Sequence, residues 1–457
     1  PSVGKVYASC PNSCKNDLNL AIDSAKKAFP DWSNLTSEHR SKYLFKIAAL
    51  LKKELKEFSN SETLDNGKPI TLSENLDIPR AIENLNFFGT LINNLESEIF
   101  PMEKLGINYT LKQPLGIVGT ISPWNLPLYL FTWKIAPALA TGNCVIAKPS
   151  EITPLTAYMF SKICIKAKLP KGVLNILHGE GSKIGHEIVK HPDIKAISFT
   201  GGTPTGKKIA KECSNTFKKL NLEMGGKNPV IIFDDCNYSE MMDSIVKSSF
   251  LNQGQICLAG SRIYIQKKIY NKFKKDFIER VEKIKVGDPF DQRSNQGAIV
   301  SEEHFNKIKH YIKIAKKENT KILIGGNKAS VNGHCSNGWF FEPTIIENFD
   351  DNSVVNKDEI FGPVVTLNCF KSEQEVLKMA NNSDYGLASI IWTEDMEKAQ
   401  RIAGLIESGI VWINCWLERD LRTPFGGIKN SGYGKEGGKY ALDFFTEQKN
   451  VCIKYYE

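Results

Sequence analysis

Hydrophobic residues recur at helical spacing through the first part of the chain. Between about residues 16 and 59, the segments LAIDSAKKAF and YLFKIAALLKKELKEF place an apolar side chain every three or four positions. This spacing is typical of helices that bury one face. A further helix is predicted from Asp77 to Leu95.

After residue 115, short apolar runs alternate with helical segments. The strand-like runs are GIVGTI, NCVIAK, GVLNILHG, AISFT, NPVIIF and RIYIQ, and the helical ones are TAYMFSKICIKA, KIGHEIVK, GKKIAKEC and SEMMDSIVKSSF. A second series follows, with strands TKILIGG, TIIENF, VVTLNCF, ASIIWT and GIVWIN and helices near 302–318, 373–381 and 396–407. Such alternation predicts an α/β protein with mainly parallel sheets. A length of 457 residues suggests two or three domains.

One uncharged segment, from Gln113 to Trp133, is long enough to suggest a membrane span. Prolines and glycines interrupt it, at Pro114, Gly116, Gly119, Pro123 and Pro127. Because such residues prevent one continuous helix, a buried strand followed by a loop is predicted, and no membrane contact.

Charge and cysteine content narrow the class of protein. The net charge is +8, but the lysines are interspersed with acidic and apolar residues, as on solvated helix faces. We therefore expect no nucleic-acid partner, and only a mild attraction for anionic substrates. The eleven cysteines are irregularly spaced, with no CxxC pair. This pattern predicts no metal site and a reducing compartment. The chain opens on PSVG without the segments of a signal peptide, so a cytoplasmic protein is expected.

Two glycine-rich segments follow predicted strands. The first, from Gly179 to Gly185, misses the dinucleotide fingerprint by one residue, so a plain glycine turn is an equal alternative. The second, from Gly201 to Lys208, imitates a P-loop, but Lys208 occupies the position of the magnesium-binding Ser or Thr, which disfavours ATP hydrolysis. Both place small residues where backbone N–H groups can approach a pyrophosphate.

Four residues are the candidates for chemistry: Asn125 in PWN, Lys148 in AKPSE, Glu223 in LEMGGKNP and Cys257 in NQGQICLAG. A cysteine thiolate is a strong nucleophile, and a carboxyl in an apolar stretch can have the raised pKa of a general base. An asparagine amide can donate to a developing oxyanion. The alternatives are a structural cysteine, a surface acid at a strand end and an asparagine that bonds a turn.

These residues lie within motifs that resemble the aldehyde dehydrogenase superfamily over essentially the whole chain. The motifs occur in the family's order: PWNLPLYLFTWKIAPALATGNCVIAKPSEITP, SFTGGTPTGKKIA, LEMGGKNPVIIFDD, NQGQICLAGSRI, EIFGPV, NNSDYGLA and PFGGIKNSGYGKEGG. The resemblance implies a Rossmann-type NAD-binding domain (1–95 and 115–225), an α/β catalytic domain (226–428) and a small β oligomerisation element (96–114 and 440–457). It also implies a homodimer or homotetramer, and a chain that starts some tens of residues later than its relatives.

The resemblance implies a role for each candidate. Cys257 attacks an aldehyde to give a thiohemiacetal, and Asn125 and the Cys257 N–H form the oxyanion hole. Glu223 activates the water that hydrolyses the resulting thioester. CoA-acylating relatives are disfavoured because Glu223 is present to serve water, and a catalytically silent scaffold is disfavoured because all four residues are intact.

The resemblance also implies the cofactor site. Lys148 and Glu151 match positions that hold the adenosine ribose, and a carboxylate there favours NAD over NADP. Glu359 and Phe361 position the nicotinamide ribose and ring. The remaining cofactor positions are Ser122, Trp124, Gly181, Gly185, Thr200, Gly201 and Gly202. Gly202 replaces the family's serine and removes one hydroxyl contact.

The segments TWKIAP and NCWLERDLRTPFGG resemble 2-aminomuconic and 2-hydroxymuconic semialdehyde dehydrogenases. Arg419 falls where those enzymes bind the substrate carboxylate, with Phe425 nearby. The alternatives are a salt bridge from Arg419 to Asp420, or Arg422 as the substrate ligand. Asn86 replaces a second substrate arginine, so a betaine aldehyde or a broad range of aliphatic aldehydes is the alternative substrate.

Overall fold

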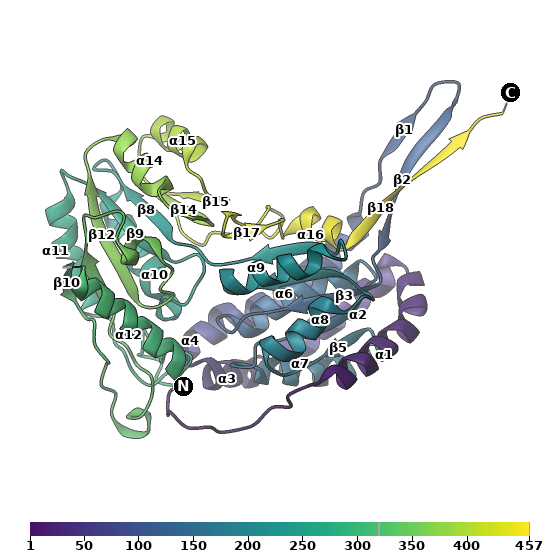
Figure 1. The fold of residues 1–457 in the computed structure, drawn as a ribbon, viewed down its shortest axis with the longest axis horizontal. Helices are drawn as coiled ribbons and strands as arrows, with labels where there is room; N and C mark the ends of the chain where they lie inside the picture. Colours follow the sequence, from purple (N-terminus) through teal and green to yellow (C-terminus); the bar gives the residue numbers. More distant parts are fainter. Residues whose placement is uncertain (319, 457) are drawn as a thin grey trace.

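The computed structural model describes residues 1–318 and 320–456. Figure 1 shows two α/β bodies side by side and an arm of strands that projects from one of them. The strands form sheets of six, seven and three strands, besides a two-stranded pair. This arrangement confirms the predicted α/β class.

The N-terminal helices form as predicted. They are α1 (Lys15–Asn34), α2 (Ser37–Lys53), α3 (Leu55–Asn66) and α5 (Ile78–Leu91). Between α3 and α5, a short turn α4 (Ile70–Leu72) leads into a π-helical turn, Ser73–Asp77, that the spacing did not predict.

The six-stranded sheet has the order β17-β7-β6-β3-β4-β5. Its strands are β3 (Ile117–Ile121), β4 (Cys144–Lys148), β5 (Leu174–Ile176), β6 (Ile194–Thr200), β7 (Lys219–Glu223) and β17 (Gly432–Tyr433). All neighbours are parallel except β17 and β7. The α-helices between residues 115 and 225 are α6 (Pro127–Ala140), α7 (Leu155–Lys166), α8 (His186–Lys190) and α9 (Thr203–Ser214). Strand β7 was missed by the sequence reasoning, and it carries Glu223 at its end.

The prediction for residues 113–133 was partly wrong. Strand β3 forms as expected, but the loop after it is short and helix α6 begins at Pro127. A proline at the first helical position lacks only an N–H that would be unpaired anyway, so it starts a helix rather than breaking one. Every residue of α6 is buried, which explains its continuous apolar sequence.

The seven-stranded sheet has the order β10-β11-β12-β9-β8-β14-β15 and is parallel except at β10. Its strands are β8 (Asn228–Ile232), β9 (Gly260–Gln266), β10 (Lys321–Ile324), β11 (Thr344–Glu347), β12 (Val364–Phe370), β14 (Ala388–Trp392) and β15 (Ile410–Ile413). The helices are α10 (Tyr238–Phe250), α11 (Tyr270–Val281), α12 (Glu302–Lys317), α13 (Val354–Lys357), α14 (Glu373–Asn381) and α15 (Met396–Leu405). Val230 joins one core and Ile231 another, because alternate side chains of a strand face opposite sides.

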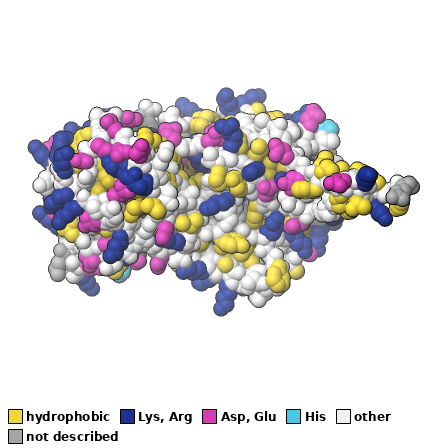
Figure 2. Space-filling view, turned by 90° about the horizontal axis from the view of Figure 1, so that it is seen from above, with side chains coloured by type: hydrophobic (Ala, Val, Ile, Leu, Met, Phe, Trp, Pro, Cys, Tyr) yellow, Lys and Arg dark blue, Asp and Glu magenta, His cyan; other side chains and the backbone are white. Residues whose placement is uncertain are grey.

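The projecting arm is a three-stranded antiparallel sheet of β1 (Ile99–Pro101), β2 (Gly106–Pro114) and β18 (Thr446–Lys454). Helix α16 (Gly438–Phe444) precedes β18, and β13 (Tyr385–Gly386) pairs with β16 (Ile428–Lys429). The arm exposes Ile99, Phe100, Leu105 and Ile453. Figure 2 shows basic and acidic side chains interspersed over the visible face, as expected for solvated helices. Of the helices in the described ranges, none is long and apolar enough to cross a membrane.

Candidate active site

A cavity of about 210 Å³ is lined by eight of the predicted site residues. It lies at loops that follow β3, β6 and β7, and parallel sheets commonly bind ligands at these carboxyl ends. The predicted residues that line it are Trp124, Asn125, Thr200, Gly201, Gly202, Cys257, Glu359 and Phe361. Residues more than 200 positions apart in the chain are therefore brought to one site.

Cys257 follows a 3₁₀ turn, Leu251–Gly254, in which Asn252 and Gln253 adopt the left-handed conformation with φ of 52° and 58°. The carbonyl of Cys257 accepts a 2.7 Å hydrogen bond from Asn228 Nδ2, which holds the backbone below the thiol. Burial, and then the charges of Glu223 and Glu359, raise the pKa of the Cys257 thiol to about 12. The free protein therefore keeps this thiol protonated at neutral pH.

Asn125 lies in the loop between β3 and α6 and is buried. Its Nδ2 donates a 3.0 Å hydrogen bond to the carbonyl of Gln255, two residues before Cys257. The amide thus lies next to the segment that carries the thiol and lines the same cavity. This placement suits a donor to an oxygen on a carbon bound to Cys257.

Glu223 is the last residue of β7 and is buried. Its Oε1 has no hydrogen-bond partner among the residues that the structure describes. Burial, followed by the charge of Glu436, raises the pKa of the Glu223 carboxyl well above its usual value. A raised pKa makes a carboxylate a stronger base, and an oxygen without a partner among the described residues can accept a proton.

Two residues beside Glu223 were missed by the sequence reasoning. Lys134 forms a 2.7 Å ion pair with Glu436 Oε1, and Trp133 Nε1 donates to the other oxygen of Glu436 at 2.7 Å. Both charged side chains are buried, and both act on the pKa of Glu223. A lone lysine directly after a long uncharged run was the available signal, because such a lysine must be buried with a partner.

Lys148 is the centre of a second group of predicted residues. Its Nζ lies 2.7 Å from Glu151 Oε2, and the other oxygen of Glu151 accepts the N–H of Gly181 at 2.9 Å. Gly185 lies beside the same lysine, since a β carbon at residue 185 would make an ordinary contact with Lys148 Cδ at 3.6 Å. Ser122 donates its N–H to the Lys148 carbonyl, and its buried hydroxyl has no partner within the described ranges.

Glu359 and Phe361 are held in unusual ways. Glu359 Oε1 accepts the N–H of Gly226 at 3.0 Å, and a β carbon at residue 225 would overlap its carboxylate. Phe361 has φ of 62°, and its carbonyl contacts Nε2 of His304 at 2.7 Å. Non-glycine residues with such strain cluster at functional sites. His304 was not singled out from the sequence.

A family model described as "Aldehyde dehydrogenase family" matches residues 1–451. The chain belongs to the aldehyde dehydrogenase family. It is 46% identical to the 2-aminomuconic semialdehyde dehydrogenase of Homo sapiens, over 100% of this chain and 94% of that one. It is 38% identical to the 2-hydroxymuconic semialdehyde dehydrogenase of Pseudomonas sp. (strain CF600), over 99% and 95% of the two chains.

Solved structures of aldehyde dehydrogenases confirm the fold. The NAD⁺ complex of an aldehyde dehydrogenase from Bacillus cereus aligns with a TM-score of 0.97 at 35% identity, over 100% of this chain and 92% of that one. A betaine aldehyde dehydrogenase from Staphylococcus aureus aligns with a TM-score of 0.95 at 39% identity, over 99% of this chain and 92% of that one. The resemblance predicted from the motifs is confirmed, and the protein is an oxidoreductase of the aldehyde group.

In this aldehyde dehydrogenase, Arg419 lies between two aromatic rings. Its guanidinium carbon is 4.3 Å from the ring centre of Trp133 and 4.0 Å from that of Phe425. Nη1 donates a 2.6 Å hydrogen bond to Tyr129 Oη, while Nη2 is buried without a partner among the described residues. A buried N–H without a partner is costly, so Nη2 is available to an anionic group.

Arg419 also lines an open cavity of about 910 Å³, together with Glu83, Phe87 and Phe425. The same guanidinium lowers the pKa values of Cys257 and Glu223, so its charge reaches the thiol site as well. The salt bridge from Arg419 to Asp420 is not formed, because Asp420 pairs with Arg422 at 2.5 Å.

The structure does not bring Asn86 to this opening. Asn86 is exposed on α5 and is absent from the residues that line the cavity. Glu83 and Phe87 line it instead, because residues four apart share one helix face. The proposed role of Asn86 as a substrate residue therefore has no support from its position.

One group in the described part of the chain has ligand atoms suited to a metal, although no metal site was predicted. These residues are Asp288, His334 and Cys335, with ligand atoms within 4.8 Å of one another. The His334 side chain is 66% exposed, and none of the three lines the Cys257 cavity.

Proposed function

We propose that this aldehyde dehydrogenase oxidises a semialdehyde with a distal carboxylate, of the muconic type, to the corresponding acid. The observation that carries the proposal is Arg419, which lines the open cavity, lowers the pKa of the Cys257 thiol by its charge, and has an Nη2 without a partner among the described residues. A planar guanidinium binds carboxylates in a fixed orientation. The relatives named as muconic semialdehyde dehydrogenases support the same substrate class.

The catalytic residues act in two stages. The Cys257 thiol gives up its proton to water, its sulfur attacks the aldehyde carbon, and the Asn125 amide with the Cys257 N–H stabilises the oxyanion. Lys148, Glu151 and Phe361 would hold NAD, which would supply the acceptor for the hydride lost when this adduct becomes a thioester. Glu223 then takes a proton from water as the water oxygen attacks the thioester, and this proton passes to the departing Cys257 sulfur, which releases the acid and the thiol. Burial raises the pKa of Glu223, which makes its carboxylate a stronger base.

The residues around Lys148 fit the adenosine end of NAD. Ser122 has a buried hydroxyl without a partner in the described part of the chain, and Gly181 and Gly185 lie beside the lysine. Lys148 and Glu151 would hold the ribose, and Gly201 and Gly202 precede helix α9, whose N-terminus suits a pyrophosphate. The Glu151 carboxylate would repel a 2′-phosphate, so we propose NAD over NADP.

Betaine aldehyde is the alternative substrate, and the Arg419 geometry disfavours it. A quaternary ammonium binds best to exposed aromatic faces. Arg419 already covers the rings of Trp133 and Phe425, and its positive charge would repel such a cation.

We also propose how the chain is organised in the cell. Residues 1–95 and 115–225 bind NAD, residues 226–428 carry the catalytic cysteine, and residues 96–114 and 440–457 assemble a homodimer or homotetramer. The apolar residues exposed on the projecting arm support such an assembly. The eleven free cysteines favour a reducing, cytoplasmic location.

The test is the formation of NADH with matched aldehydes. We expect kcat/KM for a muconic-type semialdehyde to exceed that for an uncharged aldehyde of equal length. We expect Arg419→Met to remove most of this difference, by about 10- to 100-fold, since hydrogen bonds to charged groups contribute about 1.5–3 kcal/mol. Cys257→Ala is expected to abolish turnover with both. Indifference to the carboxylate, or a requirement for CoA, would contradict the proposal.

A further inference from the structure

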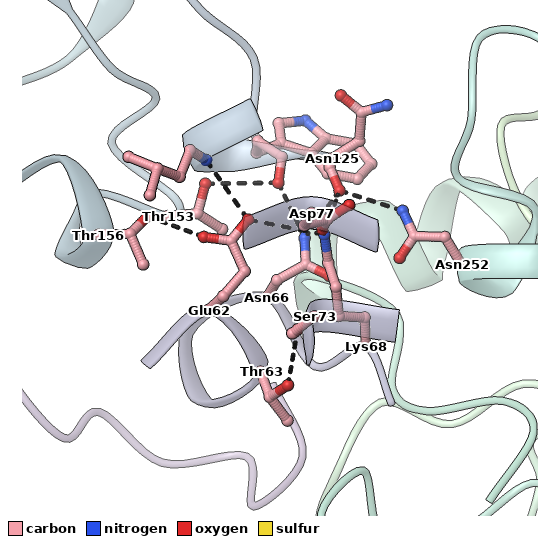
Figure 3. Close-up of polar contacts among 12 residues, drawn as sticks. Glu62, Thr63, Asn66, Lys68, Ser73, Asp77, Asn125, Thr153, Thr156 and Asn252 are labelled. Atoms are coloured by element: carbon pink, nitrogen blue, oxygen red, sulfur yellow. Dashed lines mark hydrogen bonds and ion pairs between the residues drawn. The ribbon is translucent and has the colours of Figure 1, made fainter. Parts of the chain in front are cut away.

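A cluster of charged side chains is buried directly behind the proposed oxyanion loop (Figure 3). Glu62, Lys68 and Asp77 come from α3, the loop after it and the π-helical turn, and all three are completely buried. Lys68 Nζ pairs with Asp77 Oδ2 and lies 3.8 Å from Glu62 Oε1. Neither the proposed mechanism nor the sequence reasoning used any of these residues.

The ammonium group of Lys68 contacts the loop that carries Asn125. Its Nζ donates a 3.0 Å hydrogen bond to the backbone carbonyl of Asn125. The same carbonyl accepts from Asn252 Nδ2 at 3.1 Å and contacts Asn66 Nδ2 at 3.5 Å. In Figure 3 the donors approach this carbonyl from separate chain segments. One backbone oxygen is thus held from several sides by buried donors.

This arrangement ties together the two loops that meet at the proposed reaction centre. Asn252 belongs to the turn that precedes Cys257, and Lys68 belongs to the segment after α3. Glu62 holds the same loop further along, since its Oε1 accepts the N–H of Leu128 at 3.4 Å and its Oε2 accepts from Thr156 at 2.8 Å. The backbone is therefore fixed at the Asn125 carbonyl and again at the start of α6.

A buried ion pair needs a reason other than stability. Apolar residues of similar volume often replace such pairs without loss of stability, because desolvation offsets the attraction between the charges. Catalytic donors, by contrast, depend on supporting residues that hold them in the productive orientation. Lys68 contacts the backbone of the oxyanion residue itself, which gives the pair such a supporting role.

We propose that Lys68, oriented by Asp77 and Glu62, is a positioning residue that fixes the Asn125 amide toward the substrate oxygen at Cys257. This inference rests on the proposed function, in which Asn125 stabilises the oxyanion. Lys68 acts through the Asn125 backbone and touches neither substrate nor cofactor.

The test is a double-mutant cycle. The variant Lys68→Met with Asp77→Leu replaces the pair by apolar residues and leaves no unpaired aspartate. We expect it to lower kcat/KM for the semialdehyde by about 10- to 100-fold, somewhat less than the loss of an oxyanion donor. The Kd for NAD, measured by fluorescence, is expected to stay within twofold. In an Asn125→Ala background, which keeps the carbonyl but lacks the amide, the same pair of substitutions is expected to change kcat/KM by less than threefold.

Controls separate positioning from folding. Lys218→Met removes another buried lysine that donates to backbone carbonyls, at Val189 and His191, and is expected to leave kcat/KM unchanged. Asn252→Gly keeps the left-handed backbone and the ion pair but removes a second donor to Asn125. Asn252→Gly is expected to lower kcat/KM in the wild-type background and to change it by less than threefold in the Asn125→Ala background. It tests the positioning role if the variant with Lys68→Met and Asp77→Leu does not fold.

The outcomes are distinct. If Asn125→Ala lowers activity but the Lys68 and Asp77 substitutions cause no loss, or an equal loss in both backgrounds, the positioning role is wrong and the proposed function stands. If Asn125→Ala alone leaves kcat/KM unchanged, the oxyanion assignment fails, and the positioning role fails with it.

Discussion

The carboxylate of Glu223 lies against the bare Cα of Gly426. A β carbon at residue 426 would overlap Oε1 of Glu223, the oxygen that has no partner among the described residues. Gly426 also has φ of 147°, which side chains rarely adopt. The loop that follows Arg419 and Phe425 therefore forms one wall of the space for the proposed general base.

Gly426→Ala is expected to displace Glu223 and slow hydrolysis of the thioester. Because a general base contributes about 10²- to 10⁴-fold, steady-state kcat is expected to fall at least about tenfold. The first turnover does not need this base, so a rapid burst of NADH followed by slow turnover is expected in stopped-flow measurements. An equal slowing of the burst and the steady state would show that the substitution disturbs more than Glu223.

The reactivity of Cys257 is expected to rise steeply with pH in the cofactor-free protein. Burial raises the pKa of its thiol to about 12, so the thiolate fraction grows about tenfold per pH unit between pH 7 and 10. Alkylation by iodoacetamide, followed at the Cys257 peptide by mass spectrometry, measures this directly. Arg419→Met is expected to slow alkylation at each pH, since Arg419 lowers the pKa of the thiol. A plateau near pH 9 would contradict the prediction.

Local patterns predicted most of the fold. The strands of the parallel sheets could be recognised because both of their faces are buried. In β8, Val230 faces one core and Ile231 faces another, so the whole strand is apolar. The errors occurred where local rules compete. Pro127 reads as a helix breaker but starts α6. The polar start of β7, at Lys219, hid a strand whose end supplies Glu223.

From the sequence, only the candidate site residues that lie in the recognised motifs could be predicted. Cys257, Asn125 and Glu223 were singled out by residue type and resemblance; Cys257 and Asn125 line one cavity, and the charge of Glu223 raises the pKa of the Cys257 thiol. Lys68 and Glu436 were missed, because a charged residue in a sequence looks solvated until its partner is known. Their partners, Asp77 and Lys134, lie 9 and 302 positions away, so only the tertiary structure shows that these charges are buried.

Glu83 is expected to weaken the binding of anionic substrates. It lines the same open cavity as Arg419 and carries a negative charge, which Arg80 offsets through a 2.7 Å ion pair. Glu83→Gln is expected to raise kcat/KM for a carboxylate semialdehyde severalfold at low ionic strength, and the gain is expected to shrink as salt screens the charges. Glu83→Asp keeps the charge and serves as the control. An equal gain with an uncharged aldehyde would exclude this electrostatic explanation.

Glu151 is expected to determine the choice between NAD and NADP. Its Oε2 pairs with Lys148, and its Oε1 accepts the Gly181 N–H. Glu151→Gln keeps the acceptor for Gly181 but removes the charge. The ratio of kcat/KM for NADP to that for NAD is expected to rise at least about tenfold. The reason is that the Glu151 carboxylate would no longer repel the 2′-phosphate of NADP, and placing like charges together costs several kcal/mol. An unchanged ratio would place the discrimination elsewhere.

Glu62 is expected to make stability depend on pH in a direction unusual for a carboxyl group. Burial raises its pKa in the folded protein to about 7, whereas an unfolded glutamate titrates near 4.3. Between these values the folded state holds a proton that the unfolded state has lost, so this group lowers the free energy of unfolding as pH rises, until about pH 7.

Glu62→Gln does not titrate and retains one acceptor oxygen, as the protonated acid does. Its Tm relative to the wild type is therefore expected to increase from pH 5 to pH 7 and to level off above that, as measured by calorimetry. Glu54→Gln, at a glutamate that pairs with Lys166 near the surface, serves as the control, and no such increase is expected there. A difference in Tm between Glu62→Gln and the wild type that stays constant over this range would mean that Glu62 is ionised in the folded protein even at pH 5.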